Sequence, residues 1–132
     1  MKYMLDTNMC IYIIKKHPVH VLNTIKRLNI SDICISSVTL AELEYGVQKS
    51  ERKAQNSLAL AEFLSPVEIM AFDEKAAIEF GKIRAALERK GKLIGEYDLM
   101  IAAHALSLGL ILVTNNIKEF TRVPHIRIEN WI

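Results

Sequence analysis

The hydrophobic and polar positions of the chain fall into two alternating patterns. Short apolar runs typical of buried strands occupy residues 3–5, 32–37, 67–72 and 110–116, with a further candidate at 125–132. Longer stretches with helical spacing of apolar residues occupy 9–16, 19–29, 38–50, 51–65, 73–90 and 98–109. Because strands alternate with helices, the sequence predicts one α/β domain, residues 1–132, with a parallel sheet covered by helices on both faces.

Polar residues at the ends of these segments predict helix boundaries. The candidates for N-caps or first residues are Thr7, Asn8, Ser37, Asp73 and Asp98, and Gly109 is a candidate C-cap. The predicted strand at 110–116 changes abruptly from apolar to polar at Thr114.

The composition is that of an ordinary folded protein. Of the 132 residues 51% are hydrophobic, and 17 Lys and Arg against 15 Asp and Glu give a formal net charge of +2. Any contact with nucleic acid must therefore come from a local basic patch. No signal peptide or membrane-length apolar run is present, so we expect a cytoplasmic protein without membrane contact. Cys10 and Cys34 lack CxxC spacing and are expected to be buried thiols.

Three acids from distant parts of the sequence are predicted to meet at one edge of the sheet. Asp6 ends the first strand, Glu42 lies one turn into the helix after the second, and Asp98 opens a later helix. Ligands of open parallel sheets bind beyond the carboxyl ends of the strands. Clustered carboxylates repel one another unless a cation neutralises them, and Mg²⁺ or Mn²⁺ prefers such oxygen ligands. The pattern therefore indicates a divalent metal site suited to phosphate chemistry.

Each of these residues also has a purely structural interpretation. Asp6 and Asp98 stand where acids commonly cap helices, and Glu42 could be a solvated acid near a helix start. Asn116 could be a turn residue. His104 is expected to pack within its helix rather than to act in catalysis.

Four ordered blocks of sequence resemble the PIN domain, and in particular the VapC-type toxins of bacterial toxin–antitoxin pairs. The blocks are "MLDTN", "SSVTLAELEYGVQKS", "GEYDLMIAAHALSLG" and "LVTNNIKEFTRVPHIRIENW". The resemblance runs the length of the chain. It implies a three-layer α/β/α sandwich with a central, mostly parallel sheet. It also implies a Mg²⁺- or Mn²⁺-dependent endoribonuclease that cleaves RNA with metal-activated water, the toxin of a type II system.

The resemblance also implies roles for individual residues. Asp6, Glu42 and Asp98 match the metal-binding catalytic acids. Asn116 stands at a fourth catalytic position, usually an acid, so the site loses one charge and a second metal comes into question. The supporting residues would be Asn8, Thr114 and Glu119, of which Glu119 could supply the missing charge.

The expected substrate is RNA, with initiator tRNA cut in its anticodon stem-loop as the first expectation from the resemblance. The basic residues proposed to contact RNA are Lys15, Lys49, Arg52, Arg84 and Lys92. The resemblance further implies a homodimer, a VapB-type antitoxin, and a toxin–antitoxin complex that binds operator DNA. Two alternatives remain open: a PIN-fold module that binds RNA or a partner with little or no catalysis, and a PIN nuclease of RNA maturation without an antitoxin.

Overall fold

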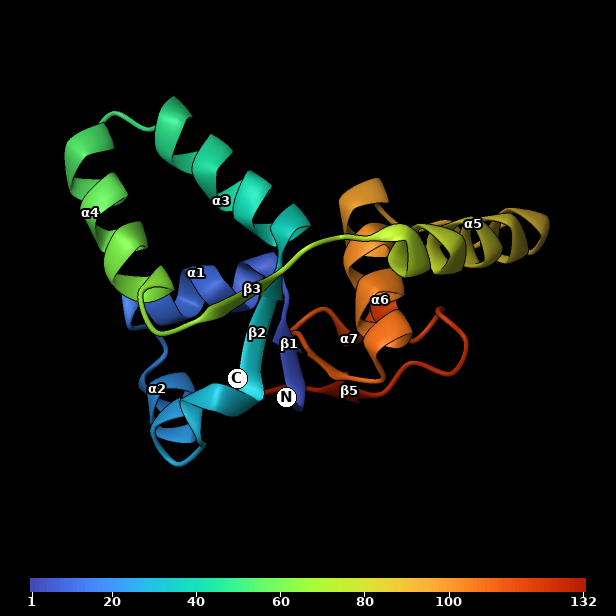
Figure 1. Cartoon of the computed structure of the whole chain (residues 1–132), viewed down its shortest axis with the longest axis horizontal. Coiled ribbons are helices and arrows are strands. Elements are labelled where there is room, and N and C mark those ends of the chain that lie inside the picture. Colours follow the sequence, from blue (N-terminus) through green and yellow to red (C-terminus); the bar gives the residue numbers. More distant parts are fainter.

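The computed structural model describes residues 1–132 and places five strands between two groups of helices (Figure 1). The strands are β1 (Tyr3–Leu5), β2 (Ile33–Ser36), β3 (Glu68–Met70), β4 (Ile111–Val113) and β5 (Ile128–Glu129). The helices are α1 (Thr7–Lys15), α2 (Val19–Lys26), α3 (Ser37–Lys49), α4 (Lys53–Leu64), α5 (Glu74–Arg89), α6 (Glu96–Leu108) and α7 (Ile117–Phe120), with a 3-10 turn η1 (Ile30–Asp32). The predicted α/β fold is confirmed.

The order of the strands locates the functional edge of the sheet. The order is β3-β2-β1-β4-β5, and every neighbouring pair is parallel. In the central register Met4 lies opposite Cys34 on one side and Leu112 on the other. The chain builds outward from β1 to β3 and then returns to the opposite side of β1. The point where the order reverses therefore lies between β1 and β4, which is where α/β sheets bind ligands.

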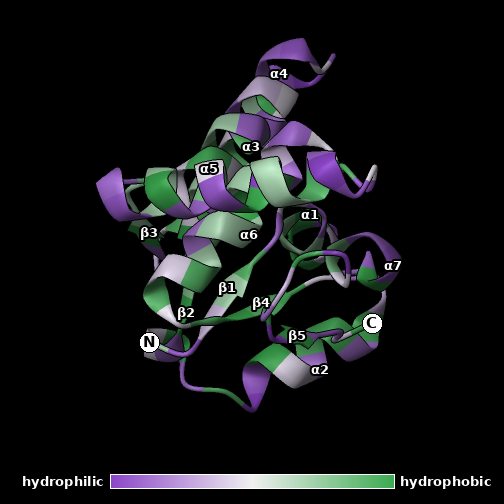
Figure 2. Cartoon of the chain, turned by 90° about the vertical axis from the view of Figure 1, so that its right-hand side faces the viewer, coloured by the Kyte–Doolittle hydropathy of each residue, from purple (hydrophilic) through white to green (hydrophobic).

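Alternate residues of each strand enter two separate hydrophobic cores. Met4 and Leu112 belong to a core completed by residues of α5 and α6. Tyr3 and Leu5 point to the other face, where residues from α1 to α4 complete a second core. Hydrophobic colouring is concentrated in the central strands, whereas much of α4 is hydrophilic (Figure 2). This alternation is the physical basis of the three layers.

The two helical layers differ in shape. Helices α3 and α4 form a hairpin that extends away from the sheet, and α5 and α6 lie together on the other side of the molecule (Figure 1). The two termini overlap in Figure 1, but the turned view of Figure 2 shows them on opposite sides of the molecule. The rings of Tyr3 and Trp131 pack edge to face with centroids 5.3 Å apart, which fastens the end of the chain to the first strand.

The structure identifies the N-caps of α1 and α3. Of the capping candidates Asp6, Thr7 and Asn8, Asp6 caps α1, because the Met9 amide donates to Asp6 Oδ1 at 2.8 Å. Ser36, rather than Ser37, caps α3. Asp6 directly follows β1 and Ser36 is the last residue of β2, since each strand passes into its helix without an intervening loop.

The start of α6 also differs from the prediction, whereas other helix boundaries agree with it. Helix α6 begins at Glu96 with Gly95 at its N-cap, so Asp98 lies in the first turn rather than opening the helix. Asp73 caps α5, and Gly109 ends α6 in the left-handed conformation at φ 68°, as predicted.

Both cysteines are free and buried, as predicted. Burial and the charge of Glu68 raise the pKa of the Cys34 thiol to about 12, so this thiol remains protonated and unreactive. None of the helices combines the length and the apolar character that crossing a bilayer requires.

Replacing Leu112 by Ala should destabilise the protein by about 2–5 kcal/mol, because its fully buried side chain fills the core between the sheet and α6. Leu58, on α4, is 63% exposed, and Leu58→Ala should change the free energy of unfolding by no more than about 0.5 kcal/mol. Urea unfolding of both variants measures the difference. Equal destabilisation by the two substitutions would contradict the placement of the core.

Candidate active site

Asp6 and Thr114 meet where the strand order reverses. Asp6 follows β1 and Thr114 follows β4, and the Asp6 amide donates to the Val113 carbonyl at 3.0 Å, which continues the parallel ladder. The Thr114 hydroxyl donates to Asp6 Oδ2 at 2.6 Å, and the Met9 amide holds Oδ1. Asp6 is only 2% exposed. Its carboxylate is therefore fixed in orientation by one donor on each oxygen.

Glu42 reaches the same region from α3. The Thr7 hydroxyl donates to Glu42 Oε1 at 2.6 Å and lies 3.3 Å from the Thr39 hydroxyl. Because Thr7 directly follows Asp6, this bond brings the Glu42 carboxylate next to the first acid. The sequence suggested Thr7 only as a capping residue, and its role as the partner of Glu42 was not predicted.

Glu119 supplies a fourth carboxylate to the cluster. The Gly95 amide donates to Glu119 Oε1 at 3.0 Å, and the Asn116 side-chain amide donates to Oε2 at 2.6 Å. Glu119 also adjoins Asp98, because its hydrogen bonding and its charge are among the causes that raise the pKa of Asp98. The resemblance placed Asn116 at the fourth, usually acidic position, and in the structure its Nδ2 donates to Glu119. A carboxylate therefore lies beside Asn116, three residues later in the chain.

The hydroxyl of Thr114 connects the two halves of the cluster. It donates to Asp6 Oδ2 and accepts the backbone N–H of Asn116 at 2.9 Å. A single buried hydroxyl therefore fixes both the first carboxylate and the turn that carries Asn116. These contacts place Thr114 beside the first acid, at the edge of the sheet where the sequence analysis expected it.

Burial and neighbouring carboxylates raise the pKa values of Asp98 and Asp6. Burial, hydrogen bonding with Glu119, and the charges of Glu119, Asp6 and Glu42 raise the pKa of Asp98 to about 7. Burial raises the pKa of Asp6, and the charge of Glu42 adds to this, although the donors Thr114 and Met9 oppose it. None of the four acids takes part in an ion pair of the chain. The cluster therefore lacks a positive countercharge of its own.

This donor set fits a hard divalent cation. All of the charged donors are oxygens, and a cation would remove the repulsion that raises the pKa of Asp98. No three His, Cys, Asp or Glu side chains form a group that could hold a metal by themselves. The predicted convergence of Asp6, Glu42 and Asp98 is therefore looser than a closed set of three ligands. Mg²⁺ commonly binds through only one or two carboxylates and keeps several waters.

Two of the predicted RNA-binding residues, Lys15 and Lys49, lie close to the acids. Lys49 lines a cleft together with Thr7, Asn8 and Glu42. Lys15 lines an adjoining groove between α1, α3 and α4, which Glu42 also borders. The exposed side chain of Asn8 faces this cleft but has no hydrogen bond to the acids.

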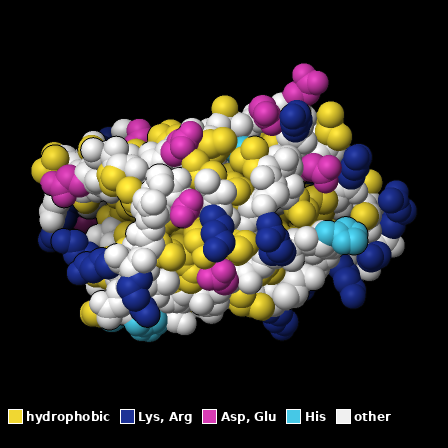
Figure 3. Space-filling model, turned by 60° about the horizontal axis from the view of Figure 1, so that its bottom comes forward, with side chains coloured by type: hydrophobic (Ala, Val, Ile, Leu, Met, Phe, Trp, Pro, Cys, Tyr) yellow, Lys and Arg dark blue, Asp and Glu magenta, His cyan; other side chains and the backbone are white.

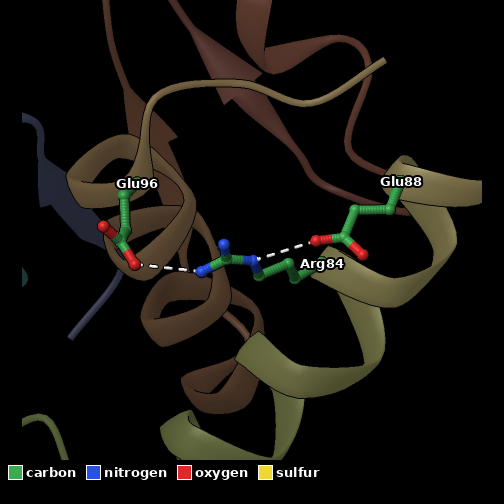
Figure 4. Close-up of polar contacts among 3 residues, drawn as sticks. All are labelled: Arg84, Glu88 and Glu96. Carbon is green, nitrogen blue, oxygen red and sulfur yellow. Dashed lines mark hydrogen bonds and ion pairs between the residues drawn. The ribbon is translucent and has the colours of Figure 1, made fainter. Parts of the chain in front are cut away.

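The other basic candidates have different surroundings. Arg84 pairs with Glu96 at 2.9 Å and with Glu88 at 3.3 Å, so it links α5 to the first turn of α6 (Figure 4). Arg52 occupies the N-cap position of α4, and Lys92 lies exposed between α5 and α6. Lysines and arginines are distributed in several groups over the face shown in Figure 3, rather than in one continuous patch.

His104 packs in the interior, as predicted. Its side chain is 1% exposed, its Nδ1 lies 2.8 Å from the Ser36 hydroxyl, and its ring packs edge to face on Phe72. Burial lowers its pKa, which favours the neutral ring. The residue connects α6 to the end of β2 and lies outside the acidic cluster.

Comparison with known proteins agrees with this fold. Residues 3–126 match the family model of the PIN domain. The chain is 50% identical over 132 residues to ribonuclease VapC2 of Haemophilus influenzae, covering 100% of this chain and 99% of that protein. It is 51% identical over 131 residues to the tRNA(fMet)-specific endonuclease VapC of Salmonella typhimurium, covering 99% and 98% of the two chains.

A solved structure is similar over the whole chain. The crystal structure of VapBC2 from Rickettsia felis bound to a DNA fragment from its promoter matches with a TM-score of 0.94 and 49% identity, covering 100% of both chains. The chain therefore belongs to the PIN-domain family and, within it, to the VapC ribonucleases.

Asp98→Asn should flatten the pH dependence of stability in the metal-free protein. The ordinary aspartate pKa is 3.8, whereas the folded chain raises that of Asp98 to about 7. The folded state thus binds this proton more tightly, and the stability gained is complete below about pH 4 and lost as the pH rises through about 7. Urea unfolding in EDTA should show a smaller loss of free energy of unfolding between these pH values in the variant.

The control for this experiment is Glu62→Gln, which removes an exposed carboxylate on α4. It should retain the pH dependence of the unsubstituted chain. Identical pH profiles for Asp98→Asn and the unsubstituted chain would contradict the assignment of the raised pKa to Asp98.

Thr114→Val should destabilise the fold by about 1–3 kcal/mol, because a nearly isosteric change removes the donor to the buried Asp6 carboxylate. Thr114→Ser retains the hydroxyl and should preserve the hydrogen bond at a lower cost. Thermal or urea unfolding of the two variants compares them. If Val and Ser were equally tolerated, the hydroxyl would not have the structural role assigned to it.

Proposed function

We propose that the chain is the toxin of a VapBC-type toxin–antitoxin pair and cleaves RNA as a Mg²⁺- or Mn²⁺-dependent endoribonuclease. The observation that carries this proposal is the group of carboxylates Asp6, Glu42, Asp98 and Glu119, which has no countercharge and lies where the strand order reverses. A protein that only bound RNA, a polyanion, would gain nothing from repelling acids at this edge.

The roles of the residues follow from their positions. Asp6, fixed by Thr114 and Met9, and Asp98 would hold the cation, with Glu42 and Glu119 on either side. When bound, the divalent cation would lower the pKa of a water molecule and stabilise charge developing on the phosphate. Because the pKa of Asp98 is about 7 in the metal-free chain, Asp98 would have to release its proton near neutral pH in order to hold the cation. Thr114, Thr7 and Asn116 orient the carboxylates.

The proposed target is initiator tRNA, cut in the anticodon stem-loop. The support for this target is the relative from Salmonella typhimurium, 51% identical over nearly the whole chain and named a tRNA(fMet)-specific endonuclease. Attack by water on phosphorus would leave a 5′-phosphate and a 3′-hydroxyl without any part for the 2′-hydroxyl.

The proposed partner is a VapB-type antitoxin, and the complex of a toxin homodimer with antitoxin would bind operator DNA. The support is the similar VapBC2 structure from Rickettsia felis, which was solved on promoter DNA. The unpaired carboxylates would also attract a basic antitoxin side chain at the active-site groove.

The first test is incubation of purified, antitoxin-free protein with total bacterial RNA and Mg²⁺ or Mn²⁺, followed by mapping of the cut ends by sequencing. We expect one discrete cut in initiator tRNA. EDTA should abolish it, and Asp98→Asn should reduce its rate by about 100-fold or more, as expected on loss of a charge-stabilising group. Intact RNA with both metals, from folded protein, would favour an RNA- or partner-binding module instead.

Substitutions at residues 116 and 119 test which of them provides the fourth acidic function. Glu119→Gln should lower the cleavage rate about as strongly as Asp98→Asn, whereas Asn116→Ala should have a smaller effect, because the carboxylate remains. Asn116→Asp should also impair cleavage, since it replaces the donor to Glu119 Oε2 with a repelling acid. Higher activity of Asn116→Asp would instead make residue 116 the fourth ligand.

A further inference from the structure

A cleft of about 490 Å³ adjoins the acids and is lined by exposed aromatic and basic side chains. It lies between α1, α3 and the start of α6, and its lining includes Thr7, Glu42, Tyr45, Lys49 and Tyr97. Its volume is within the range of about 300–1,000 Å³ found for small-ligand sites. The cleft is thus large enough to receive part of a substrate whose reactive bond lies at the acids.

Two exposed aromatic rings border this cleft. Tyr45 is 66% exposed and Tyr97 is 59% exposed, and every other Tyr, Phe and Trp of the chain is buried or half-buried. The only two exposed aromatic side chains therefore lie on the same cleft, beside the acidic cluster. Leaving both rings in water sacrifices the free energy that their burial would provide, which indicates a surface that another molecule covers.

Each tyrosine is connected to an acid through its helix. Tyr45 lies three residues after Glu42 on α3, a spacing that puts the two side chains on the same side of the helix. Tyr97 directly precedes Asp98 in the first turn of α6. The rings are therefore held by the same two helices that bring the carboxylates together, and a phosphate at the acids would place its flanking bases near them.

Lys49 adds a positive charge to one wall of the cleft. Its Nζ lies 5.1 Å from the centroid of the Tyr45 ring, and it lines the same cleft. An aromatic ring next to an exposed ammonium group suits a nucleotide, since the ring can stack on the base and the ammonium can contact the adjoining phosphate. A purely apolar segment of a protein partner would not need this charge.

We propose that Tyr45 and Tyr97 form a stacking subsite for unpaired nucleobases next to the cleaved phosphodiester, with Lys49 contacting the RNA backbone. This inference rests on the proposed ribonuclease function and adds that the substrate must present single-stranded nucleotides at the cut. Bases within a duplex stack on their neighbours and offer no free face to the rings.

The test measures binding of a short fluorescein-labelled single-stranded RNA by anisotropy in EDTA, and in parallel cleavage of the RNA mapped as above. Tyr45→Ala and Tyr97→Ala should each weaken binding by about tenfold, as expected for loss of one stacked base. Both should raise KM more than they lower kcat. Tyr45→Phe and Tyr97→Phe keep the ring and should bind like the unsubstituted chain.

Matched controls separate stacking from a general loss of structure. Leu58→Ala removes an equally exposed apolar side chain, 63% accessible on α4, and should change neither binding nor cleavage. The same RNA annealed into a duplex should bind equally to the unsubstituted chain and to the Ala variants. Lys49→Gln should lower the slope of log affinity against log salt by roughly 0.7, the value for one phosphate contact on a single strand.

Several results would contradict the proposed stacking subsite. Ala variants that bind and cleave like the unsubstituted chain would exclude stacking while leaving the ribonuclease function intact. Phe variants as defective as Ala variants would assign the effect to the hydroxyls rather than to the ring faces. Unchanged RNA affinity together with weakened antitoxin binding would make the cleft a protein-docking surface. Absence of cleavage by the unsubstituted chain would refute the proposed function separately, since the binding measurement needs no cleavage.

Discussion

The structure depends on one hydrogen bond, between the Thr114 hydroxyl and Oδ2 of the buried Asp6 carboxylate at 2.6 Å. Parallel pairing of β1 with β4 places these residues side by side at the point where the strand order reverses. The same hydroxyl accepts the Asn116 amide, and Asn116 in turn orients Glu119. Strand pairing, helix capping and the placement of the carboxylates therefore share one buried contact.

This arrangement concentrates negative charge that the chain itself does not neutralise. Asp6 and Asp98 have raised pKa values because of burial and because of the neighbouring carboxylates. Two hydrophobic cores, one on each face of the sheet, hold the helices that carry Glu42 and Asp98 in place despite this repulsion. Because a positive charge would relieve the repulsion between the carboxylates, a cation or a basic group of a partner would bind here.

Much of this could be predicted from the sequence, because hydrophobic periodicity indicates which segments are strands and helices, and the polar residues after the strands indicate the functional edge of the sheet. Asp6, Glu42, Asp98 and Thr114 were predicted in this way. The order of the strands came from the structure. Glu119 was named as a possible source of the charge missing at Asn116, but its hydrogen bonds could not be predicted, because they depend on how one turn of α7 and the Gly95 amide meet in space. For the same reason the sequence misplaced Asp98 as a helix cap and gave no indication that Thr7 holds Glu42.

The most direct test of the central claim is calorimetric titration of Mn²⁺ into the purified protein near pH 7, in buffers with different ionisation enthalpies. If a cation relieves the repulsion around Asp98, binding should release protons, because a carboxyl with a pKa of about 7 must give up its proton to serve as a ligand. Asp98→Asn should both weaken Mn²⁺ binding and abolish most of this release. Tight binding without proton release, or binding unaffected by Asp98→Asn, would contradict the account.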